Sequence, residues 1–191
     1  MAFNFPGSAQ NIVKIATVNA AAQSTVVFTS GFTSTYNSWR VVITNLIMLQ
    51  GGGTSLVLNM STNGGSSYDS GTNYAWTQRW FDSDNNQNSN QGKSGTATSI
   101  QLLNPIPETG TATSNAGFNI DLSNFISTTR YKTIYGIGSI IYTNAGDSPT
   151  LVCVDQRTAG SYNSTSAVNA IQFSATAGGN ITGTFTLYGI V

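Results

Sequence analysis

The apolar residues of this chain alternate with polar residues over many short stretches, and this spacing constrains the fold more than any other feature. Phe118, Ile120 and Leu122, for example, are separated by Asn119 and Asp121. Side chains on a β-strand point alternately to the two faces of a sheet, so a period of two predicts strands with one buried face. No long stretch keeps the period of 3.6 residues that an amphipathic helix needs. The sequence therefore predicts an all-β protein.

The stretches with this pattern are separated by turn sequences, among them Asn63-Gly64 and Gly178-Gly179-Asn180. We expect the second of these turns to join the last two strands in a hairpin. Short strands at this spacing predict a single-domain antiparallel β-sandwich, jelly-roll-like in its connections. Residues 1–24 are expected to form an N-terminal arm and the first strand, and residues 25–191 the sandwich. The predicted strands cover residues 11–18, 25–29, 39–48, 55–60, 73–81, 99–103, 117–122, 131–142, 150–154, 167–175 and 181–191.

Charged side chains are scarce, with seven basic and seven acidic residues among 191 and a formal net charge of zero. Binding to nucleic acid or to an acidic membrane relies on clustered Lys and Arg, and the basic residues form no cluster in the sequence. No apolar stretch reaches the roughly 18 to 20 residues of a membrane span. We therefore expect neither a nucleic-acid nor a membrane partner. The lone cysteine, Cys153, lies in an apolar run and is expected to be buried and inert.

The combinations of residues that catalysis commonly uses are not found in this sequence. General acid–base catalysis near neutral pH usually employs histidine or paired carboxylates, but the chain has no histidine and only Asp82 and Asp84 are close in sequence. There is no Gly-x-Ser-x-Gly motif, and Gly92-Lys93-Ser94 matches only the end of a phosphate-binding loop. The sequence therefore predicts a protein that is not an enzyme and holds no cofactor.

Residues 82–95 contain no apolar side chain, and we expect them to form a solvated loop. Within this segment Asp82, Asp84, Asn86 and Asn88 place oxygen ligands at alternate positions, as a calcium-binding loop does. The glycine and the closing glutamate of the EF-hand pattern are both absent. Two interpretations therefore stay open: a calcium site on these four residues, or an ordinary solvated loop.

Aromatic residues are the second candidate feature. Tyr74, Trp76 and Trp80 fall on one face of a predicted strand, and Arg79 falls on the opposite face. Exposed indole rings next to amide and carboxylate groups favour a sugar-binding surface, because the rings stack on sugars while the polar groups orient hydroxyls. The alternative is that these aromatic residues pack in the core or in a subunit interface.

Two further aromatic residues, Phe3 and Phe5, precede Pro6 near the N-terminus. This segment has the form of an extended arm whose rings need an apolar partner. We expect it either to dock onto a neighbouring subunit or to fold back on its own sheet.

Three stretches of the chain carry a resemblance to a known group of proteins. They are residues 36–46, YNSWRVVITNL, residues 58–71, LNMSTNGGSSYDSG, and residues 183–190, GTFTLYGI. Together they resemble a recurrent module of bacteriophage virion proteins that occurs in tail-fibre and capsid-decoration contexts. The resemblance extends from about residue 25 to residue 191 and is weaker in the polar middle. Its motifs are strand and turn patterns, so it assigns a role to no individual residue.

The resemblance implies a β-sandwich that decorates a virion, commonly as a homotrimer. We therefore expect a non-enzymatic structural protein, assembled in the host cytoplasm and placed on the capsid surface as a decoration or cement protein in contact with the major capsid protein. A short tail-fibre tip, adaptor or receptor-binding protein, with tail proteins and host glycans as partners, is the first alternative. A carbohydrate-binding module is the second.

Overall fold

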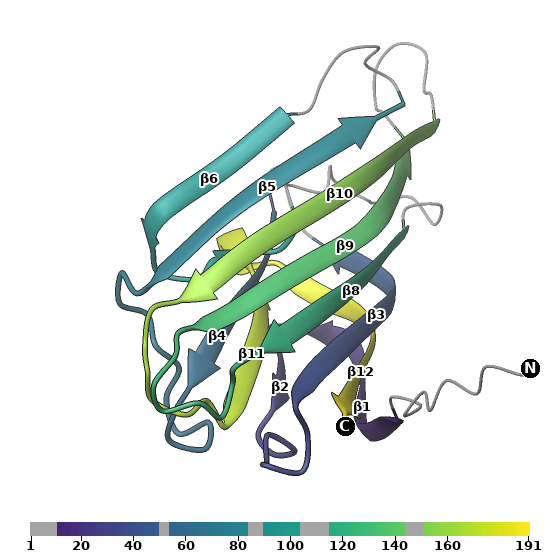
Figure 1. Ribbon diagram of the computed structural model, residues 1–191. Helices are drawn as coiled ribbons and strands as arrows, with labels where there is room; N and C mark the ends of the chain where they lie inside the picture. Colours follow the sequence, from purple (N-terminus) through teal and green to yellow (C-terminus); the bar gives the residue numbers. More distant parts are fainter. Residues whose placement is uncertain (1–10, 50–53, 84–89, 104–114, 144–150) are drawn as a thin grey trace, which may run out of the picture.

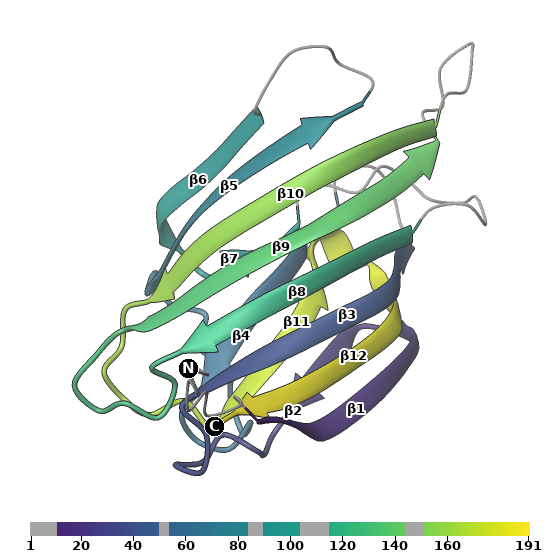
Figure 2. The same cartoon turned by 45° about the vertical axis from the view of Figure 1, so that its right-hand side comes forward.

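The computed structural model describes residues 11–49, 54–83, 90–103, 115–143 and 151–191. These residues form two antiparallel sheets that pack face to face, which confirms the predicted all-β sandwich (Figure 1). The strands β2, β4 and β11 of the smaller sheet lie behind the larger sheet, while β6 and one end of β5 extend past them (Figures 1 and 2).

Within the described residues the larger sheet has eight strands in the order β1-β12-β3-β8-β9-β10-β5-β6. Their bounds are Ile12–Gln23 for β1, Asn180–Ile190 for β12, Ser38–Leu49 for β3, Asn115–Ser123 for β8, Lys132–Thr143 for β9, Leu151–Tyr162 for β10, Tyr74–Asp82 for β5 and Asn90–Ala97 for β6.

The smaller sheet has the order β2-β11-β4-β7 in the same part of the chain. Its strands are Thr25–Phe28, Ala170–Ala175, Leu56–Ser61 and Ile100–Gln101, and a single 3-10 turn, Thr176–Gly178, follows β11. The first strand, β1, pairs with β12 and forms one edge of the larger sheet.

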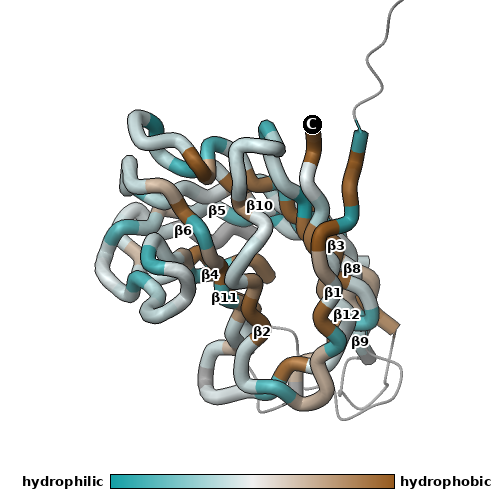
Figure 3. Tube along the Cα trace, turned by 90° about the horizontal axis from the view of Figure 1, so that it is seen from below, coloured by the Kyte–Doolittle hydropathy of each residue, from teal (hydrophilic) through white to brown (hydrophobic). Residues whose placement is uncertain are grey.

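The core fills the space between the two sheets, because the period of two turns every second side chain inward. In β8 the inward residues Phe118, Ile120 and Leu122 are fully buried. A view from below separates the layers, with β2, β4 and β11 on one side and β3, β8 and β12 on the other (Figure 3). The two faces of the core meet at pairs such as Phe173 of β11 and Phe185 of β12, whose ring centroids are 5.2 Å apart.

Two predictions about connections are wrong. The turn at Gly178-Gly179-Asn180 does not form a hairpin, because β11 pairs with β2 and β4 in the smaller sheet while β12 pairs with β1 and β3 in the larger one. Alternation of apolar residues identifies a strand but carries no information about which sheet the strand joins. Gly178, with φ of 72°, adopts the left-handed conformation that this passage between the sheets requires.

The second wrong prediction concerns the polar segment 82–95. Its second half belongs to β6, which pairs with β5 from Trp80↔Asn90 to Tyr74↔Ala97. Since β6 is the edge strand of the larger sheet, it is held by backbone hydrogen bonds on one side and needs no alternating apolar face. A polar strand of this kind cannot be distinguished from a loop by hydropathy.

Candidate functional site

The structure separates the three aromatic residues that the sequence placed on one face of a strand. Tyr74 is fully buried in the core, where its ring stacks on Tyr162 with centroids 4.9 Å apart. Trp76 and Trp80 are half-buried and pack against the core from the inward side of β5. Arg79 points to the opposite, exposed side, as the alternation predicts. Tyr74 is therefore a packing residue, and only the two tryptophans retain partly exposed rings.

The candidate calcium residues and the N-terminal arm fall largely outside the described residues. Asp84, Asn86 and Asn88 are not described, and neither are Phe3 and Phe5. Asp82, the remaining calcium candidate, is the last residue of β5 and is half-buried. No group of three or more His, Cys, Asp or Glu side chains that could hold a metal ion occurs among the residues that the structure describes.

A polar network lies at the end of the sandwich where β4 and β10 finish. Asp69 accepts hydrogen bonds from the Gly71 N–H at 2.7 Å, the Asn73 amide at 2.9 Å and the Tyr162 hydroxyl at 2.8 Å. The Tyr74 hydroxyl donates to the Asp69 carbonyl oxygen at 3.0 Å. Asp69 and Tyr162 also line a pocket of about 250 Å³ together with residues 60–63 and 67.

Burial and hydrogen bonding in this network move the pKa values of its members apart. Burial opposes ionisation of Asp69, but the hydrogen bonds from Gly71, Asn73 and Tyr162 outweigh it, so the pKa of this carboxyl is lowered. Burial raises the pKa of Tyr74 to about 12. Burial, followed by the hydrogen bond to Asp69, also raises the pKa of Tyr162. The network is therefore built for an ionised Asp69 and two neutral tyrosines.

Stability is expected to fall at both ends of the pH range. The folded pKa of Asp69 lies below its unfolded value, so its contribution is present above about pH 4 and is lost as the pH falls through the folded pKa. The raised pKa values of Tyr74 and Tyr162 stabilise the fold below about pH 10, and this contribution is lost above that pH, with a slope of up to about 1.4 kcal/mol per pH unit for each tyrosine. Urea denaturation at a series of pH values measures both the acid and the alkaline loss of stability.

Three variants test whether Asp69 causes the acid loss of stability and the two tyrosines the alkaline loss. Tyr162→Phe is expected to reduce the alkaline slope, and Asp69→Asn the acid slope. Tyr131→Phe, which changes a tyrosine that is 56% exposed, serves as the control and is expected to alter neither. An alkaline slope that is the same in Tyr162→Phe and in the unsubstituted protein would contradict the role given to the network.

Lys132 is a buried titratable group outside this network. Its Nζ donates to the carbonyl oxygens of Ser127 at 2.6 Å and Arg130 at 3.0 Å, and burial lowers the pKa of its ammonium group. Both acceptors lie in the loop that precedes β9. The side chain therefore holds this loop against the end of the sandwich, which is a structural role.

In the described part of the chain, the outer face of the larger sheet carries several exposed apolar side chains. Its apolar members come from β5, β9 and β10 and are between 38% and 66% exposed. We refer to Phe81, Tyr135, Ile137, Ile141 and Leu151 as the outer-face patch. The strands pair in the order β9-β10-β5, so these side chains belong to one continuous surface.

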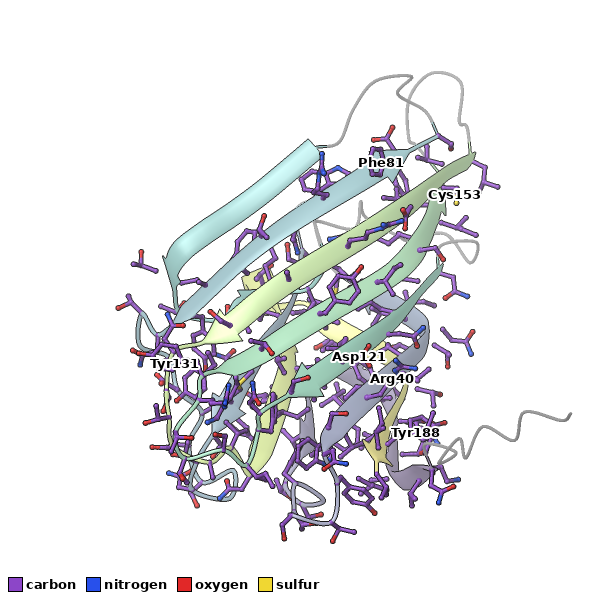
Figure 4. The ribbon with its side chains drawn as sticks, viewed as in Figure 1. Arg40, Phe81, Asp121, Tyr131, Cys153 and Tyr188 are labelled. Atoms are coloured by element: carbon purple, nitrogen blue, oxygen red, sulfur yellow. The ribbon has the colours of Figure 1, made fainter. Side chains whose placement is uncertain are left out.

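Cys153 lies on this same face, next to Ile141 across the strand pair, and is exposed. The prediction that it is buried is wrong. Val152 and Val154, on either side of Cys153 along β10, are buried, so the period of two turns Cys153 outward. Figure 4 shows Cys153 and Phe81 toward one end of this face. Successive residues of an apolar run in a strand point alternately to the two faces of the sheet, so such a run places apolar side chains on the outer face as well. The same kind of run is the sequence signal for the outer-face patch.

Polar groups accompany the apolar ones. Arg40 of β3 and Asp121 of β8, which are directly opposite in the register, form a bidentate ion pair with distances of 2.6 Å and 3.0 Å (Figure 4). Nearer to β5, a shallow depression of about 230 Å³ is formed on this face by Thr77, Gln78, Arg79, Tyr135, Arg157, Thr158 and Ala159. Sequence reasoning missed this depression, because its residues come from three strands that are distant along the chain.

No α-helix long and apolar enough to span a membrane occurs in the described residues. Comparisons with protein-family models, with curated proteins and with solved structures find no match to this chain. The resemblance to phage virion modules therefore stays a prediction from the sequence.

Proposed function

We propose that this chain is a non-enzymatic structural protein of a bacteriophage particle, most simply a capsid decoration protein that binds the assembled shell as a trimer. The observation that carries the proposal is the outer-face patch. Five large apolar side chains are exposed on this face among polar groups such as Asp155 and Arg157, and exposed apolar clusters rimmed by polar residues commonly mark interaction sites. Aromatic residues and arginine, both present on this face, are enriched in protein–protein interfaces.

Cementing by such a protein requires no chemical reaction. Each subunit would cover a joint between shell proteins and stabilise it by burying apolar surface, with a standard interface removing roughly 1,200–2,000 Å² from water. Trimer formation would then raise the overall affinity, since the second and third contacts form at a high effective concentration. A sheet face whose strands are held by backbone hydrogen bonds is suited to this role because little conformational entropy is lost on docking.

The half-buried Trp76 and Trp80 favour one alternative. If their exposed edges stack on glycans, the protein belongs at the tail, as a fibre tip or receptor-binding protein. This alternative requires binding to host cells or their glycans and no binding to shells.

The proposal is tested by mixing the purified protein with shells of the major capsid protein of the same phage, and separately with host cells. We expect a trimer by light scattering that sediments with shells and not with cells. The double variant Phe81→Ser/Leu151→Ser is expected to weaken shell binding about tenfold or more, because buried aromatic and aliphatic anchors dominate interface energies. Val27→Ser, which changes an exposed aliphatic residue of the smaller sheet, is the matched control and should bind as the unsubstituted protein does.

Binding to cells without binding to shells would identify the protein as a tail protein, such as a fibre tip or receptor-binding protein. Equal shell binding by the double variant and the Val27→Ser control would exclude the outer-face patch as the docking surface. Turnover of any polysaccharide by the purified chain would overturn the non-enzymatic assignment.

A further inference from the structure

Two arginines face each other across neighbouring strands on the outer face of the larger sheet. Arg157 of β10 is directly opposite Arg79 of β5, and both side chains are exposed. Residues in such positions have their Cβ atoms about 4.5–5.5 Å apart, and like charges placed there are destabilising. The chain has only seven basic residues in all, so an opposed pair is not the result of a generally basic surface.

The charge of this pair is only partly neutralised. Asp155 lies two residues before Arg157 on the same face, with its Oδ2 3.3 Å from the Arg157 Nη2. Within the described residues Arg79 has no ion-pair partner. The contrast with Arg40 is clear, since Asp121 neutralises that guanidinium through two hydrogen bonds. Among the residues that the structure describes, the outer face therefore carries unbalanced positive charge around Arg79.

The shallow depression described above lies at this same place. The register puts the small Ala159 of β10 between Tyr135 of β9 and Thr77 of β5. A methyl group between two larger side chains leaves a hollow, and Arg79 and Arg157 stand at its edge one row further along the strands. The hollow thus combines an aromatic wall, an apolar floor and two guanidinium groups.

We infer that this hollow receives a carboxylate side chain of an acidic protein partner, bound between Arg79 and Arg157 and against the ring of Tyr135. Guanidinium groups bind carboxylates through paired, charge-assisted hydrogen bonds, and a carboxylate between the two arginines removes their mutual repulsion. The inference rests on the proposed function, because it assigns a chemical character to the partner that docks on the outer-face patch.

The charge distribution also selects among possible occupants. A second copy of the chain docked through the same face would bring one arginine pair toward another, which charge complementarity disfavours. A negatively charged protein surface satisfies the arginines, and the surrounding apolar residues Ile137 and Phe81 would exclude water from the contact. A foreign, acidic partner therefore fits this face better than a second copy.

The experiment uses a hexaglutamate peptide as the probe, added at low ionic strength to protein with 15N-labelled arginine side chains. We expect saturable shifts of the Arg79 and Arg157 Nε–H signals. Arg79→Gln and Arg157→Gln are each expected to weaken peptide binding about tenfold or more, because a charged hydrogen-bonding partner is lost. Arg130→Gln removes the same charge from an exposed loop residue and is the matched control, expected to change the affinity less than about twofold.

Three results would overturn the inference. The first is an Arg130→Gln variant that loses as much affinity as Arg79→Gln, which would reduce the effect to net charge. The second is tighter binding of glucuronate than of hexaglutamate, measured by shifts of the same two arginine Nε–H signals. This result would make the occupant an acidic sugar. The third is self-association of the unsubstituted protein that Arg79→Gln abolishes, which would make it a second copy.

The titration contains no shell, so it separates the inference from the proposed function. Specific peptide binding by a protein that does not sediment with shells contradicts the proposed function. Shell binding that is lost in Phe81→Ser/Leu151→Ser but unchanged in Arg79→Gln contradicts the inference and leaves the proposed function supported.

Discussion

Replacing Trp39 by alanine is expected to lower the free energy of unfolding by about 3–5 kcal/mol, the usual cost of removing a buried tryptophan side chain. Trp39 lies on β3 and is fully buried. Its ring is 5.6 Å from that of Phe32 and 6.1 Å from that of Phe125 between centroids, and Tyr36 meets it edge-on at 6.4 Å. The substitution would leave a cavity inside this aromatic cluster.

A lost hydrogen bond adds to the cost. The Trp39 Nε1–H donates to the carbonyl oxygen of Gly31 at 2.9 Å, and alanine would leave that partly buried acceptor without this donor. Urea denaturation followed by circular dichroism gives the change in stability. Trp80→Ala removes the same side chain from a half-buried position and is expected to cost clearly less. A loss for Trp39→Ala no greater than that for Trp80→Ala would contradict the central role of this cluster.

Adding a single methyl group at Gly138, in the middle of the larger sheet, is the second substitution with a large expected effect. The Phe118 ring of β8 lies across Gly136 and Gly138 of β9, so a Cβ on Gly138 would collide with that ring and with the Gly117 carbonyl oxygen. It would also be 2.9 Å from the Phe118 Cα, a backbone atom that no side-chain rotation can move away. Since β8 and β9 would have to separate, we expect Gly138→Ala to destabilise the fold by about 1–3 kcal/mol or more.

Gly95→Ala is the matched control, because a Cβ at this position of the edge strand β6 meets no atom within 4 Å. Its effect is expected to stay within about 0.5 kcal/mol. Thermal and urea denaturation of the two variants provide the measurement. Equal stability of Gly138→Ala and Gly95→Ala would show that the central strands adjust without cost, and would contradict the tight packing of Phe118.

The tryptophans of β5 illustrate how far the candidate site could be predicted. Alternation correctly placed Tyr74, Trp76 and Trp80 on one face, because this depends only on the pleat of a single strand. It could not determine that Tyr74 is buried under Tyr162, since Tyr162 comes from a different strand. How deeply each ring is buried depends on whether segments distant in the chain pack over it, and no local sequence pattern contains that information.

The outer-face patch was missed for a related reason. Residues 132–142 carry apolar side chains on both faces of β9, with Ile134 and Ile140 inward and Tyr135, Ile137 and Ile141 outward. A strand with two apolar faces predicts that both are covered by something. The sequence alone does not say whether the second cover is another part of the chain or a partner, and in the structure the described residues leave the outward side chains exposed.

The sequence by itself determined the all-β class, most of the strands, which residues of a strand share a face, and the scarcity of charge, because these follow from local spacing and composition. The tertiary structure alone decided that β11 and β12 join different sheets, that a polar segment pairs as the edge strand β6, and that Arg79 lies opposite Arg157. The physical reason is that strand order is set by burial of apolar faces between segments distant in the chain. The pairing of β5 with β10 is such a non-local contact, and it creates the arginine pair from two residues that have no relation in the sequence.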